Sequence, residues 1–145
     1  MRKNFGAKTW LYPMPVLIVG TYDENGIPNA MNAAWGINSG RDEIALFISK
    51  PHKSTKNILE TKAFTVSIAD AANVVPTDYV GIDTEHTFAI IGKVVKTQVE
   101  ESALDENGKI DIAKLNAISF DTFRFGYYTL GEKVATAWDA GKPLV

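Results

Sequence analysis

The chain has 145 residues, of which 46% are hydrophobic, and its formal net charge is −2. The length suits one domain, residues 1–145, with a core of its own, the charge argues against a nucleic-acid binder with its usual basic face, and no run approaches the ~18 apolar residues of a membrane span. Because there is no cysteine and there are only two histidines, a Cys/His zinc site is not expected, and redox chemistry would need a bound organic cofactor.

We do not expect the first residues to form a secretory signal. A basic start at 1–4 is followed by an apolar run that Pro13 and Pro15 interrupt, and no small-residue cleavage site follows. A signal peptide needs a continuous apolar region and such a site. We therefore expect a cytoplasmic protein that does not bind membranes.

Two extended segments, Val16–Tyr22 and Ile27–Trp35, flank the pair Asn25-Gly26. This is a strong hairpin signal, since both residues tolerate the positive φ of a tight turn. The outgoing arm combines small residues with amides and ends on a large ring: Asn29, Ala30, Met31, Asn32, Ala33, Ala34 and Trp35. Small side chains let a flat ligand approach the backbone, and amides can hydrogen-bond its edge.

The next segments alternate between loop, strand and helix. Gly36–Asp42 is rich in Gly, Asn and Ser and is expected to be a loop. Glu43–Ser49 is strongly apolar and predicts a strand, and Phe64–Ala69 alternates at period two, as a half-buried strand does. Between them Ser54–Thr61 predicts a short helix with Ser54 as its N-cap.

The second half of the chain gives weaker signals. Asp70–Gly81 indicates a short helix broken at Pro76. Thr87–Val99 is the longest predicted strand, with a bulge or bend at Gly92. Asp111–Leu115 fits one helical turn.

The pattern as a whole favours an antiparallel barrel, closed or nearly closed, over a βαβ sheet, because the predicted strands are short and helices are few. No Gly-x-Gly-x-x-Gly follows a strand, so a Rossmann unit is not supported. The tetrapeptide Asp-Glu-Asn-Gly occurs at 23–26 and again at 105–108, but its flanks do not match. We interpret it as one turn used twice.

A basic and polar loop joins the predicted strand 43–49 to the predicted helix. A helix N-terminus offers unpaired N–H groups and a partial positive charge, and this one adds lysines and hydroxyls. The loop therefore fits a phosphate cradle, although a solvated basic loop with an ordinary N-cap would look the same. The candidate residues are Ser49, Lys50, His52, Lys53, Ser54, Thr55 and Asn57.

The segment Asn29–Trp35 resembles the signature of the flavin reductase-like, FMN-binding split-barrel family, in particular its flavoredoxin branch. The resemblance runs from Asn4-Phe5-Gly6-Ala7 to Tyr79-Val80-Gly81, resumes near His86, and includes Phe125–Ala135, which is similar to the family's C-terminal Tyr-x-x-Leu-Gly segment. It implies an all-β protein with short flanking helices, folded as a Greek-key antiparallel split β-barrel. Relatives usually have a longer segment between Gly81 and His86. We expect that the sequence omits residues between Gly81 and Glu85; the alternative is that a strand of the barrel is lacking here.

The resemblance also implies a cofactor and its site. FMN would bind with its ring against 29–35 and its phosphate in the loop 49–57. Tyr128 would lie near the flavin, although an aromatic cluster is as often core or subunit interface. His86 is a candidate catalytic or binding residue. The family resemblance and the many aromatic residues near both termini imply a homodimer with the flavin near the subunit boundary.

The expected function is that of a flavin reductase or flavoredoxin-like carrier, an oxidoreductase that passes hydride or electrons from NAD(P)H or a protein donor through bound FMN. A redox protein would then be a possible partner. Two alternatives stay open: a non-catalytic flavin-binding carrier or sensor, and a cofactor-free barrel used for protein association.

Overall fold

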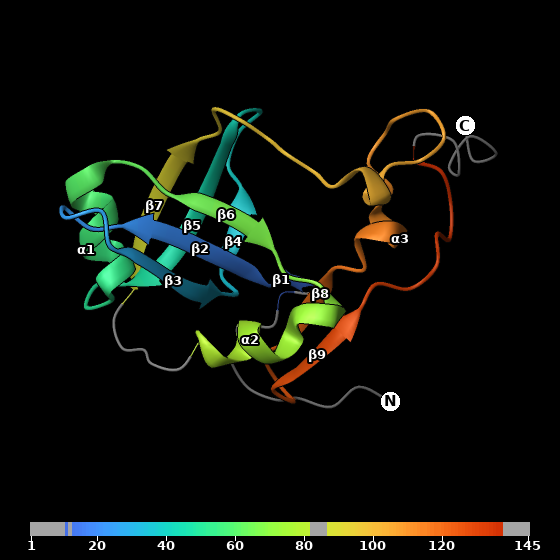
Figure 1. Cartoon of the computed structure of the whole chain (residues 1–145). Coiled ribbons are helices and arrows are strands. Elements are labelled where there is room, and N and C mark those ends of the chain that lie inside the picture. Colours follow the sequence, from blue (N-terminus) through green and yellow to red (C-terminus); the bar gives the residue numbers. More distant parts are fainter. Residues whose placement is uncertain (1–10, 12, 82–86, 138–145) are drawn as a thin grey trace.

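Antiparallel strands dominate the structure, a computed structural model that describes residues 11, 13–81 and 87–137 (Figure 1). The few helices are short, which confirms the all-β prediction with flanking helices, and none of those in the described ranges is long and apolar enough to cross a membrane. The strands are β1 (Met14–Pro15), β2 (Leu17–Tyr22), β3 (Pro28–Ala33), β4 (Gly36–Asn38), β5 (Glu43–Ser49), β6 (Thr65–Ile68), β7 (Thr87–Lys93), β8 (Ile118–Asp121) and β9 (Gly126–Thr129). The helices are α1 (Lys53–Thr61), α2 (Val74–Tyr79) and α3 (Ile112–Leu115), with 3₁₀ turns at Ala71–Asn73 and Glu101–Ala103.

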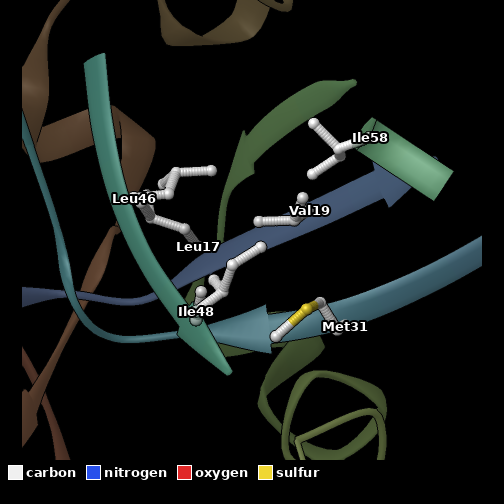
Figure 2. Close-up of a cluster of buried hydrophobic side chains, with 7 residues drawn as sticks. Leu17, Val19, Met31, Leu46, Ile48 and Ile58 are labelled. Carbon is white, nitrogen blue, oxygen red and sulfur yellow. The ribbon is translucent and has the colours of Figure 1, made fainter. Parts of the chain in front are cut away.

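The strands form three three-stranded sheets, ordered β3-β2-β6, β4-β5-β7 and β1-β8-β9. The first two share one hydrophobic core. Along β2 every second residue is buried, as the two-residue period of a strand requires. The core side chains from β2, β3, β5 and α1 point toward one another in Figure 2: Leu17, Val19, Met31, Leu46, Ile48 and Ile58.

The ladders do not close into a full barrel within the described residues. β6 pairs only with β2, and β7 pairs only with β5, so each keeps one open edge there. The bulge expected at Gly92 is absent, because Gly92 pairs regularly with Ile44. A glycine is required at position 92 because a Cβ there would lie 2.5 Å from Cζ of Phe64. Residues 82–86, where the shortened segment was expected, lie outside the described residues.

The hairpin β2–β3 forms as predicted, but its turn is not the two-residue type. Of the pair Asn25-Gly26 only Gly26 has positive φ, 76°. Its N–H donates to the carbonyl of Asp23, and the Asp23 Oδ1 accepts from Asn25 and Ile27. The same three hydrogen bonds recur at 105–109, where Gly108 has φ 72°. The repeated tetrapeptide is therefore one turn used twice, as predicted.

Several predicted elements differ from the expectation. The predicted loop after Trp35 begins with strand β4, since Gly36–Asn38 pairs with β5. The long strand predicted to Val99 ends at Lys93. Pro76 does not break α2, because it lies in the first turn, where no intrahelical N–H bond is needed.

Candidate functional site

A cavity of about 150 Å³ lies where helix α1 begins, opposite strand β3. In Figure 1 the helix lies beside the hairpin end of β3. Three separate segments line the cavity: Asn29, Ala30, Met31 and Asn32 from β3, His52, Lys53 and Ser54 from the start of α1, and Val80 and Gly81 after α2. The structure thus brings together parts of both segments that the sequence singled out.

The N-terminus of α1 is suited to bind an anion. His52 occupies the N-cap position without a side-chain capping bond, so first-turn N–H groups are left for a ligand. The prediction that Ser54 is the N-cap was wrong, because Ser54 lies inside the first turn. Its Oγ accepts a hydrogen bond from Asn29 Nδ2 at 2.8 Å, which leaves the hydroxyl hydrogen free to donate to a ligand.

His52, which lines the same cavity, carries a buried polar atom. Its Nε2 is buried and has no hydrogen-bond partner among the described residues. Leaving such an atom unpaired costs about 1–3 kcal/mol of stability. A ligand with a hydrogen-bonding group in the cavity would remove that cost.

Two neighbouring polar residues serve to anchor the helix. Thr55 Oγ1 donates to the carbonyl of Ser49 at 2.6 Å, and Asn57 Nδ2 donates to Thr21 Oγ1 at 3.0 Å. Both Thr55 and Asn57 are 1% exposed and lie outside the cavity lining. These bonds fix the start of α1 to the end of β5 and to β2.

The charge at the cavity is balanced by the hairpin turn. Lys53 Nζ lies 3.5 Å from Asp23 Oδ2. The N–H of Ile27, together with the N–H of Asn25 and the charge of Lys53, lowers the pKa of Asp23. Lys50 is exposed and does not belong to the lining. Among the described residues, Lys53 is therefore the cation that the structure brings to the cavity.

The third wall, Val80–Gly81, was not among the predicted site residues. The N–H of Asn32 donates to the Val80 carbonyl, and Asn32 Nδ2 donates to the Thr77 carbonyl, both at 3.1 Å. A Cβ at Gly81 would lie 3.1 Å from both Asn32 Cβ and the Asp78 carbonyl oxygen. A glycine directly after a short helix was the signal that could have indicated this close approach.

The remaining predicted residues lie elsewhere. Ala33 and Ala34 are buried, and Trp35, 49% exposed, lies beyond the cavity lining. Tyr128 lines a different hollow on the β8–β9 hairpin. His86 lies outside the described residues.

Solved structures of flavin proteins resemble this chain over nearly its whole length. Flavoredoxin of Desulfovibrio vulgaris (Miyazaki F) is 31% identical, with a TM-score of 0.91 over 97% of this chain and 100% of that one. Flavoredoxin from Methanosarcina acetivorans is 20% identical, with a TM-score of 0.89 over 100% of both chains. An FMN-binding protein from Thermus thermophilus shares the fold at 16% identity, with a TM-score of 0.72 over 93% of this chain and 99% of that one. No protein-family model matches, and no curated protein does.

Proposed function

This chain belongs to the flavoredoxin branch of the flavin reductase-like, FMN-binding split-barrel family, and on that premise we propose that it is an FMN-dependent oxidoreductase. The observation that carries the proposal is the start of α1, which has no side-chain cap and opens onto Ala30 and the amides of Asn29 and Asn32 in β3. An anionic group could bind at the start of α1 while a flat ring attached to it lies against β3.

The residues present fit the phosphate end of FMN. First-turn N–H groups, the Lys53 ammonium and the Ser54 hydroxyl are donors suited to a phosphate. The buried Nε2 of His52 would gain a partner. The cavity of about 150 Å³ is smaller than the ~300–1,000 Å³ of typical ligand pockets. We infer that it encloses the phosphate and part of the ribityl chain, and that the ring extends along β3.

The protein's own groups would hold and orient the cofactor. Bound FMN would supply the hydride and electron transfer. Ala30 leaves room for close approach, and the amide of Asn29 holds the Ser54 hydroxyl in place. NAD(P)H is the proposed electron source, with a redox protein as the alternative donor or as the acceptor.

Absorbance spectroscopy and ligand titration test the proposal. The purified protein, reconstituted with FMN, should be yellow and should bind FMN at least tenfold more tightly than riboflavin, since one charge-assisted hydrogen bond contributes about 1.5–3 kcal/mol. Anaerobic bleaching by NADH or NADPH would support a nicotinamide donor, and its failure would refute that donor. A protein that binds neither flavin would refute the proposed function.

A further inference from the structure

Tyr127 of β9 connects the C-terminal hairpin to the wall of the cavity. Its hydroxyl donates to Asp78 Oδ1 at 2.8 Å, across 49 positions of sequence. Its ring packs with Phe120 at a centroid distance of 5.6 Å, in a cluster that also contains Val74 of α2. The side chain therefore binds α2 in its last turn, through Asp78.

The same end of α2 is linked to β3 through Asn32. Burial, aided by the Asp78 carboxylate, raises the pKa of Tyr127 to about 12. Asn32 binds the carbonyls of Thr77 and Val80. A continuous set of hydrogen bonds thus joins β3, α2 and β9 directly behind the wall.

We propose that Tyr127 is a positioning residue for the flavin site: through Asp78, whose carbonyl accepts from the Gly81 N–H, it sets how closely Val80–Gly81 approaches Asn32 of β3. The inference rests on the proposed function for its effect on flavin, but its structural part does not need the cofactor. Tyr127 itself is not in the cavity lining, so it would act only through the wall.

The substitution Tyr127→Phe keeps the ring and removes the hydroxyl. In the protein without FMN, hydrogen exchange of the Asn32 N–H, which donates to the Val80 carbonyl, should become about tenfold faster, the size expected when one hydrogen bond to a charged acceptor is lost. The control Tyr79→Phe makes the same chemical change at a side chain that is 78% exposed on the same helix, and should leave this exchange unchanged.

With flavin added, Tyr127→Phe should weaken the binding of FMN and of riboflavin by the same several-fold factor, because both ligands would contact the Val80–Gly81 wall. The substitution should also shift the visible spectrum of bound flavin. Unchanged exchange at Asn32 would overturn the inference. So would an equal acceleration at Val19 in the central strand β2, which would indicate global destabilisation. If the unsubstituted protein binds no flavin, the proposed function fails, and the exchange measurement alone decides the positioning role.

Discussion

Replacing Lys53 with alanine should weaken FMN binding about tenfold and leave riboflavin binding unchanged. Lys53 lines the cavity at the first position of α1, and its side chain is 51% exposed. A charge-assisted hydrogen bond contributes about 1.5–3 kcal/mol. Solvent screens a half-exposed ammonium, so we take the lower end, and about 1.4 kcal/mol corresponds to tenfold in affinity.

The fold should tolerate the change. The substitution removes the ion pair between Lys53 Nζ and Asp23 Oδ2, 3.5 Å apart, and an exposed pair of this kind contributes only about 0–1 kcal/mol. The free energy of unfolding, measured in urea, should therefore change by less than about 1 kcal/mol. Fluorescence titration with FMN and with riboflavin, at one fixed ionic strength, measures the two affinities.

Lys56→Ala is the matched control. Lys56 is in the same helix, is 70% exposed and pairs with Glu60 at 3.8 Å, outside the cavity lining. The net charge changes identically, so a general electrostatic effect would appear in both variants. Equal losses for FMN and riboflavin in Lys53→Ala, or an equal FMN loss in Lys56→Ala, would refute the phosphate assignment.

Three further outcomes are expected. Asn57→Ala should lower the free energy of unfolding by about 1–3 kcal/mol in urea, because it leaves the buried Thr21 hydroxyl without its donor. The pKa of Tyr127 is raised to about 12, so the folded state favours the protonated phenol. The phenol's contribution to the free energy of unfolding is therefore complete below its ordinary pKa near ~10 and is lost as the pH rises toward the folded pKa. Tyr127→Phe should flatten the fall of the free energy of unfolding between these two pH values. We also expect a homodimer, since the β8–β9 hairpin exposes aromatic side chains such as Phe125, 80% exposed; light scattering that shows a monomer at micromolar concentration would contradict it.

Local chemistry explains what the sequence predicted well. The Asp-Glu-Asn-Gly turns depend on an aspartate that accepts neighbouring N–H groups and on a glycine with positive φ, all within five residues. The bounds of β5 matched because its apolar run is continuous. Asp111 caps α3 through the N–H of Ala113. In each case the partners are neighbours in sequence, so a pattern of residue types is sufficient.

Contacts between distant segments could not be predicted in this way. Strand β4 forms because β5 is there to pair with it, although Gly36–Asn38 has the composition of a loop. The wall at Val80–Gly81 exists because Asn32 binds carbonyls 45 and 48 positions further along the chain. Composition can identify an amide that needs partners, but it does not say which carbonyls will supply them.

The segment 49–57, from the end of β5 into α1, shows the same limit inside the candidate site. Its hydroxyls and amides all looked alike as phosphate donors in the sequence, yet the structure gives them two tasks. Thr55 and Asn57 are 1% exposed and donate to Ser49 and Thr21, so each already uses a side-chain hydrogen to hold the helix. Ser54 is equally buried, but its oxygen accepts from β3, which leaves its hydrogen for a ligand. The direction of one hydrogen bond, which depends on the hairpin packing against α1, therefore separates a binding hydroxyl from an anchoring one.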